Sequence, residues 1–187
     1  MSQRASDGPG QPRLLLTGRP GCGKTTVIRG TLSRFGKERC AGFYTEEVRQ
    51  GGRRIGFDVV TLDGRRAPLA RAGAPGPGVS RYGVDVAAFE ALGVAVLESA
   101  LTTPHRPLVI DEIGKMELFS ERFIVALEKI FDPASPHAVL GTIMRGRHPI
   151  TDKIRRSPQV RVIEVTRENR DSLPDRLAAR LSEEGRG

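Results

Sequence analysis

Residues 18–26 of this 187-residue chain carry the side chains and spacing that could do chemistry. They read GRPGCGKTT and fit the pattern G-x-x-x-x-G-K-[ST], in which glycines let consecutive backbone N–H groups converge on phosphate oxygens. We expect Lys24 to reach the β- and γ-phosphates and the Thr25 hydroxyl to bind Mg²⁺. This segment, called the phosphate loop below, predicts a nucleoside-triphosphate site made by Gly18, Arg19, Pro20, Gly21, Cys22, Gly23, Lys24, Thr25 and Thr26.

The segments on either side of the phosphate loop supply the context that it requires. The apolar residues 14–16 before it predict a buried strand, and Val27, Ile28 and Leu32 after it form one apolar helical face. A helix that begins here directs its positive dipole end at the anion. The strand, loop and helix therefore occur in the order of a phosphate-binding unit.

A second apolar run, at residues 108–110, leads into two carboxylates. We expect a parallel strand next to that of the phosphate loop, which delivers Asp111 to the metal side of the phosphates. Side chains alternate along a strand, so Glu112 can also face the site only if the strand ends there, as Ile113 and Gly114 indicate. Glu112 is then placed to orient or deprotonate a water. The residues predicted to lie at the nucleotide on this side are Leu108, Val109, Ile110, Asp111, Glu112, Ile113 and Gly114.

Four further motifs resemble those of the cancer-related nucleoside-triphosphatase family, in order between Arg13 and Leu181. They are FYTEEVR at residues 43–49, GFDVV at 56–60, DEIGKME at 111–117 and TRENR at 166–170. The resemblance implies a RecA-like α/β/α fold and Mg²⁺-dependent hydrolysis of several nucleoside triphosphates to diphosphate and phosphate. We expect Mg²⁺ as the cofactor with Thr25 and Asp111 as ligands, and Lys24 and Glu112 as catalytic residues.

Alternating strand and helix patterns predict a three-layer α/β/α fold with a mostly parallel sheet and helices on both faces. Strands are expected at residues 14–17, 42–48, 108–112, 138–143 and 160–165, and helices at 24–35, 87–101, 119–131, 151–156 and up to 181. Turn signals at residues 50–52 and 63–64 predict a β-hairpin excursion of two or three antiparallel strands after the second strand. The Gly- and Pro-rich residues 72–78 predict a loop.

Length and composition favour one globular domain at residues 12–187, after a disordered lead-in at residues 1–11. No apolar run approaches the ~18 residues of a membrane span, so we expect an intracellular, cytoplasmic protein, and a monomer. The two cysteines and three histidines lack the spacing of a disulfide framework or zinc site.

The net charge of +8 allows nucleic-acid binding but does not favour it. The arginines form short clusters among acidic residues, and only 5% of the residues are aromatic, so base stacking has little support. Any arginine that approaches the γ-phosphate is expected from the basic residues Arg145, Arg147, Arg155 and Arg156.

Two other functions remain open from the residues alone. A phosphate-loop kinase would pass the γ-phosphoryl group to a small molecule instead of water. A nucleotide-dependent switch or nucleic-acid-binding module would use slow hydrolysis for timing. The only asparagine, Asn169, precedes Arg170, so the Asn-Lys-x-Asp guanine motif is absent and weak base discrimination is expected.

Overall fold

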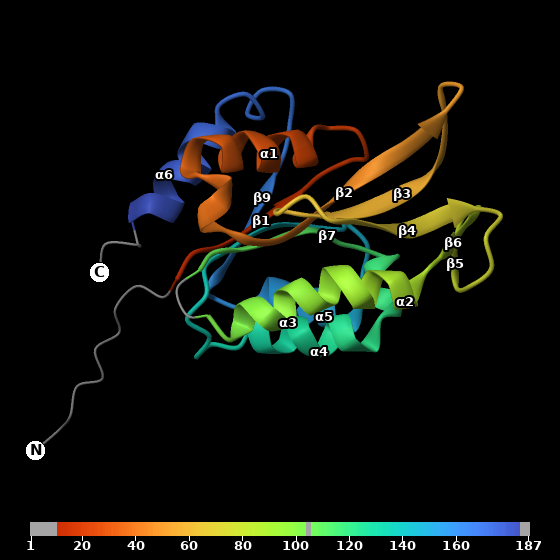
Figure 1. Cartoon of the computed structure of the whole chain (residues 1–187). Helices are drawn as coiled ribbons and strands as arrows, with labels where there is room; N and C mark the ends of the chain where they lie inside the picture. Colours follow the sequence, from red (N-terminus) through yellow and green to blue (C-terminus); the bar gives the residue numbers. More distant parts are fainter. Residues whose placement is uncertain (1–10, 104–105, 184–187) are drawn as a thin grey trace, which may run out of the picture.

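The computed structural model describes residues 11–103 and 106–183 and contains one mixed sheet between two layers of helices (Figure 1). The nine strands of this sheet follow the order β5-β6-β4-β3-β2-β7-β8-β1-β9. They are β1 (Arg13–Thr17), β2 (Ala41–Gln50), β3 (Arg53–Thr61), β4 (Arg66–Ala72), β5 (Gly78–Val79), β6 (Tyr82–Val84), β7 (Leu108–Ile113), β8 (Val139–Ile143) and β9 (Val160–Glu164). The helices are α1 (Lys24–Phe35), α2 (Val86–Phe89), α3 (Ala95–Leu101), α4 (Glu121–Ile130), α5 (Pro149–Arg156) and α6 (Leu173–Glu183).

The two faces of the sheet bury separate apolar clusters, which confirms the predicted three-layer arrangement. Leu14 and Leu16 of β1 pack toward α1 and α6, whereas Leu15 between them belongs to the cluster under α3, α4 and α5. Alternate residues of β7 and β8 divide between the clusters in the same way, since successive side chains of a strand point to opposite faces. Strands β2, β7, β8, β1 and β9 run parallel, as the alternation of strands and helices predicted.

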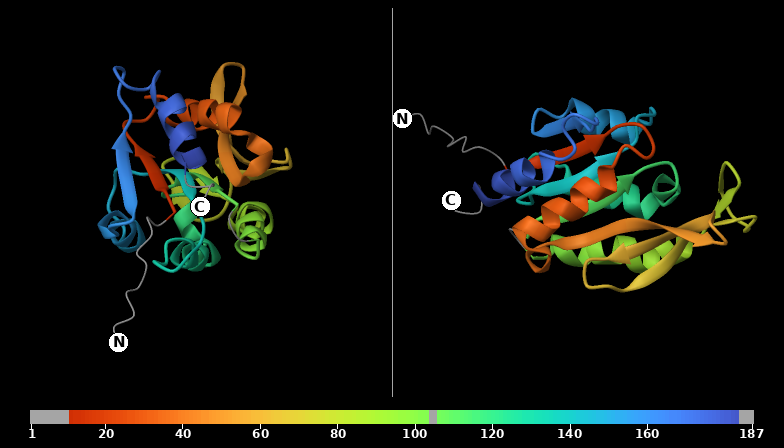
Figure 2. Two further views of the ribbon diagram at one scale, coloured as in Figure 1. Left: turned by 90° about the vertical axis from the view of Figure 1, so that its left-hand side faces the viewer. Right: turned by 90° about the horizontal axis from the view of Figure 1, so that it is seen from above.

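Strand β2 is shared between the parallel sheet and an antiparallel extension. Its first residues, 41–44, pair with 108–111 of β7, and residues 43–50 pair with β3. Gly51 and Gly52, both with positive φ, make the two-residue turn of the β2–β3 hairpin. Figure 2 shows that β2, β3 and β4 extend the sheet on the side opposite β9.

The antiparallel extension is larger than the sequence predicted, because β4 is followed by the two short strands β6 and β5. The loop that was predicted at residues 72–78 is present at residues 73–77, because Ala72 ends β4 and Gly78 begins β5. A Cβ on Gly83 would lie 1.9 Å from the Ala74 carbonyl oxygen, so the backbones approach here without side chains that would signal a strand. Within the described residues, no helix is both long and apolar enough to cross a membrane. The predicted lead-in falls almost wholly on residues 1–10, outside the described part.

Three aromatic rings form the centre of the cluster under α3 and α4. Phe89 makes edge-to-face contacts with Phe43 of β2 and Phe123 of α4, with ring centroids 5.5 and 5.3 Å apart. Its side chain is fully buried. This cluster joins β2, the strand that reaches the hairpin, to the helical layer.

Replacement of Phe89 with Ala should lower the free energy of unfolding by about 3–5 kcal/mol, because it removes buried apolar surface and leaves a cavity. Urea unfolding measures the loss. The matched control is Val125→Ala on α4, whose side chain is 50% exposed and should change stability by less than about 0.5 kcal/mol. Equal effects of the two substitutions would contradict the packing described for Phe89.

Candidate active site

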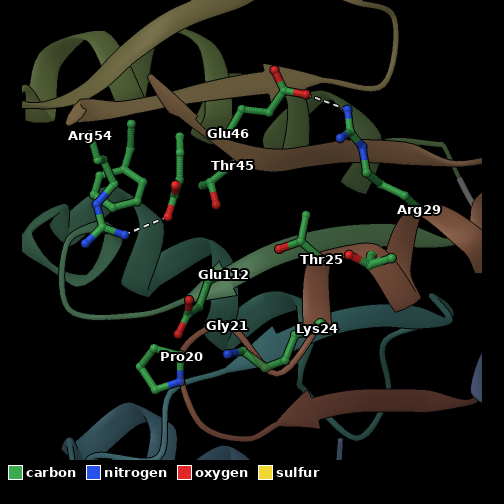
Figure 3. A pocket seen from close by; sticks show the side chains of 13 residues that line it. Pro20, Gly21, Lys24, Thr25, Arg29, Thr45, Glu46, Arg54 and Glu112 are labelled. Carbon is green, nitrogen blue, oxygen red and sulfur yellow. Dashed lines mark hydrogen bonds and ion pairs between the residues drawn. The ribbon is translucent and has the colours of Figure 1, made fainter. Parts of the chain in front are cut away.

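A cleft of about 670 Å³ opens between the phosphate loop and the β2–β3 hairpin (Figure 3). Its floor comes from the loop and the start of α1, one side from β7, and the roof from β2 and β3. The residues that line it are Pro20, Gly21, Gly23, Lys24, Thr25, Thr26, Arg29, Thr45, Glu46, Glu47, Arg54, Phe57 and Glu112.

The phosphate loop has the backbone conformation that its glycines predicted. Gly23, with φ of 106°, lies directly before α1, whose first turn contains no acidic residue that would oppose an anion. A Cβ on Gly18 would approach the Cys22 sulfur to 2.7 Å, so Cys22 fills the space beneath the loop. Lys24 Nζ donates to the carbonyl oxygen of Gly18 at 3.4 Å. Arg19 and Cys22 face a neighbouring hollow bordered by residues 164–168 instead of the main cleft.

Asp111 is almost completely buried, with 1% of its surface exposed. Its Oδ1 accepts a hydrogen bond from the Thr142 hydroxyl at 2.7 Å, while its Oδ2 has no hydrogen-bond partner among residues 11–103 and 106–183. Burial raises the pKa of Asp111, and the hydroxyls of Thr142 and Thr25 and the charge of Lys24 oppose that rise. A buried carboxylate oxygen without a partner is costly unless a further group completes its coordination.

The position of Asp111 relative to the phosphate loop differs from expectation in one respect. The strand that carries it is not adjacent to β1, because β8 lies between β7 and β1. Thr142 of this intervening strand reaches the carboxylate. The sequence could not reveal this order, since each of these strands is an apolar run of similar length.

Glu112 lines the cleft on the side of β7. Burial raises its pKa, and the nearby Lys24 ammonium lowers it. Strand β7 continues to Ile113 instead of ending at Glu112, but its pairing with β8 is interrupted between Ile110 and Ile113. The two adjacent carboxylates therefore coincide with a gap in the pairing of β7 with β8, and not with the end of β7.

The other residues predicted on this strand lie away from the cleft. Leu108, Val109, Ile110 and Ile113 are fully buried in the apolar clusters, where they hold the strand in place. Gly114 is buried beside Glu112 and Glu117, outside the cleft.

Glu117 is a buried carboxyl group that the motif reading did not single out. Its side chain lies close to Gly114, and burial together with the negative charge of Glu112 raises its pKa to about 8. Glu117 therefore stays mostly protonated at neutral pH, so it adds little negative charge behind Glu112. The only sequence feature that could have drawn attention to Glu117 is its position at the end of the DEIGKME motif.

The basic residues Arg145, Arg147, Arg155 and Arg156 do not line the cleft. Arg155 donates to the carbonyl oxygens of Met144 and Gly146, which fixes its own loop. The arginines at the cleft are instead Arg29 of α1 and Arg54 of β3. Sequence reasoning missed them, together with Thr45, Glu46, Glu47 and Phe57, although four of these residues fall within FYTEEVR and GFDVV.

The oxygen atoms at the floor of the cleft fit Mg²⁺. The unpartnered Asp111 Oδ2 and the Thr25 hydroxyl are hard oxygen donors of the kind that Mg²⁺ prefers. Across residues 11–103 and 106–183, no group of three or more His, Cys, Asp or Glu side chains could hold a metal. Phosphate oxygens and water would therefore have to supply the rest of the coordination shell.

Known proteins resemble this chain over most of its length. Residues 13–178 match a family model described as NTPase. The chain is 46% identical over 182 residues to the human cancer-related nucleoside-triphosphatase, covering 87% of this chain and 93% of that protein. It is 44% identical over 162 residues to the nucleoside-triphosphatase THEP1 of Thermotoga petrophila, covering 86% and 88% respectively. The crystal structure of THEP1 from Aquifex aeolicus superposes with a TM-score of 0.81 at 36% identity, covering 90% of this chain and 98% of that one.

Replacement of Thr142 with Val should lower the free energy of unfolding by roughly 1–3 kcal/mol, because the buried Asp111 loses its hydrogen-bond donor on β8. The measurement is urea unfolding without nucleotide or metal. Thr142→Ser keeps the hydroxyl and is the matched control, with a smaller loss. If Val and Ser at this position cost the same, the hydroxyl of Thr142 does not stabilise Asp111.

Proposed function

We propose that this protein hydrolyses ATP, GTP, CTP and UTP to diphosphate and phosphate in a Mg²⁺-dependent reaction. The starting point is that the chain belongs to the NTPase family and is a nucleoside-triphosphatase. The observation that carries this proposal is that Lys24 and Thr25 of the phosphate loop and Glu112 of β7 line one cleft, while the buried Asp111 lies close to Thr25 and Lys24. In this proposal the phosphate loop binds and neutralises the phosphates, Asp111 binds the metal, and Glu112 activates the water.

The position of each residue indicates its role in the proposed reaction. Backbone N–H groups of the loop and the Lys24 ammonium bind the phosphate oxygens and stabilise the charge that builds on them during transfer. Glu112 faces the cleft and accepts a proton from the attacking water. Burial raises the pKa of Glu112, which makes the carboxylate a stronger base, and Lys24 opposes that rise.

Thr25 and Asp111 are the residues that would hold Mg²⁺. A bound ion would supply positive charge that neutralises the phosphate oxygens. Thr142 orients Asp111 by donating to Oδ1, so Oδ2 would remain available as a metal ligand.

Base discrimination is proposed to be weak. The contacts that support the function all address phosphates, which every nucleotide shares. A preference above about a hundredfold, ~2.8 kcal/mol, would need hydrogen bonds from buried groups to the base edge.

Phosphate release from each of the four nucleoside triphosphates, with Mg²⁺ and with a chelator, tests the proposal. We expect release from all four within about a hundredfold of one another and loss of release in the chelator. Lys24→Ala is the control, since a folded protein without the Lys24 charge should release little phosphate. Undiminished release by this variant would refute the role of the phosphate loop.

Replacement of Glu112 with Gln should lower turnover by about 10²–10⁴-fold, the usual size of general-base catalysis, because the amide cannot accept the proton of water. Nucleotide affinity should change little, since the phosphate loop and Asp111 remain. Single-turnover hydrolysis and equilibrium binding on one preparation separate the two effects. Equal losses in both measurements would make Glu112 a binding residue, and near-normal hydrolysis would place the base elsewhere.

A further inference from the structure

The cleft extends beyond the phosphate loop. It measures about 670 Å³, within the range of sites that hold a small molecule. The phosphate loop lines only its floor. The opposite side, called the hairpin wall below, consists of Thr45, Glu46, Glu47, Arg54 and Phe57.

The hairpin wall lies beside the proposed base. The pairing of β2 with β7 ends at Tyr44 and Asp111, and the next residue of each strand, Thr45 and Glu112, lines the cleft. Both side chains face the same cleft in Figure 3. A molecule bound against the wall would therefore lie between the wall and Glu112, on the side where the attacking oxygen must enter.

Each carboxylate of the hairpin wall is paired with two arginines. Glu47 accepts from Arg54 and Arg49, each at 2.6 Å, and Glu46 pairs with Arg29 and with Arg66. These hydrogen bonds lower the pKa of Glu46 and of Glu47, so both carboxylates are ionised at neutral pH and are weaker bases than an unpaired glutamate. The charged side chains that line the cleft are three cations and three carboxylates, namely Lys24, Arg29, Arg54, Glu46, Glu47 and Glu112, so the lining does not select an anionic second ligand.

The hairpin wall also offers an apolar surface next to its polar groups. Phe57 contacts the Tyr82 ring edge-on at 5.3 Å, and the Arg54 guanidinium lies 5.0 Å from the Phe57 ring centroid. Carboxylate acceptors, a guanidinium donor and a hydroxyl stand around this ring. Such a surface suits a small neutral ring that carries several hydroxyl groups.

We propose that the hairpin wall binds a neutral polyhydroxylated small molecule and that the protein transfers the γ-phosphoryl group to one of its hydroxyls in competition with water. The proposal rests on the phosphate loop and Glu112 acting as described above. The acceptor oxygen forms a bond to the γ-phosphorus while the bond to the β–γ bridging oxygen breaks. The nucleoside diphosphate leaves with that electron pair, and Glu112 takes the hydroxyl proton.

The test uses the full chain with Mg²⁺ and ATP labelled in the γ-phosphate, and compares ADP formed with inorganic phosphate released. The added probes are ribose, glucose and myo-inositol in one arm, and adenosine and uridine in the other. We expect ADP to exceed phosphate with at least one probe and the missing label to appear on that probe. The two arms distinguish a free sugar or polyol from the ribose of a nucleoside.

Variants of the hairpin wall test its part in the transfer. Phe57→Ala and Glu47→Gln should each lower the ratio of transferred to released phosphate by about tenfold, the effect of about one lost contact. This ratio does not depend on how much of the protein is folded. Arg53→Ala, at an exposed neighbouring arginine outside the cleft, should leave the ratio unchanged.

Two results would overturn the proposal. One is equal amounts of ADP and phosphate with every probe, and the other is a transfer ratio that the wall variants do not alter. The function proposed above survives both, because phosphate release without any probe is measured in the same assay. Absence of that release would count against hydrolysis itself.

Discussion

The site depends on the common direction of five parallel strands. Because β1, β8 and β7 end at one edge of the sheet, the phosphate loop after β1 and the carboxylates of β7 meet although β8 separates their strands. Thr142 on β8 spans that separation by its hydrogen bond to Asp111. The apolar clusters on both faces hold this alignment, so the chemistry of the site is fixed by packing far from it.

Burial determines the behaviour of three acidic groups near this edge. Asp111, Glu112 and Glu117 all have a raised pKa, with desolvation as the largest cause. They differ in what opposes it. Lys24 acts on Asp111 and Glu112, whereas Glu117 receives only local backbone hydrogen bonds and the repulsion of its acidic neighbours. The rise in pKa is thus opposed by a cation at only two of the three neighbouring carboxyl groups.

The parts of the fold and site that follow local rules could be predicted from the sequence. The loop from Gly18 to Thr26, the strand to Asp111 and the two-glycine turn after Gln50 each have a signal within a few residues. The order of β7, β8 and β1 has none, since it depends on how similar apolar runs pair. The hairpin wall was missed because Glu46, Glu47 and Arg54 have the sequence pattern of exposed charges, and only the folded β2–β3 hairpin brings them to the cleft that Glu112 lines. The same limit applied to Arg145 and Arg155, whose charge in the sequence did not reveal that they turn away from the cleft.

The continuity of β2 has a mechanical consequence. One unbroken strand carries Phe43 in the aromatic cluster, Tyr44 beside Asp111 and Glu47 on the hairpin wall. Residues 41–44 are tied to β7 by its ladder, whereas residues 45–50 pair with β3 alone. The base of the hairpin is therefore fixed relative to the carboxylates of β7, and any bending of the roof has to occur beyond Tyr44, so a ligand has little left to order at the base of the hairpin.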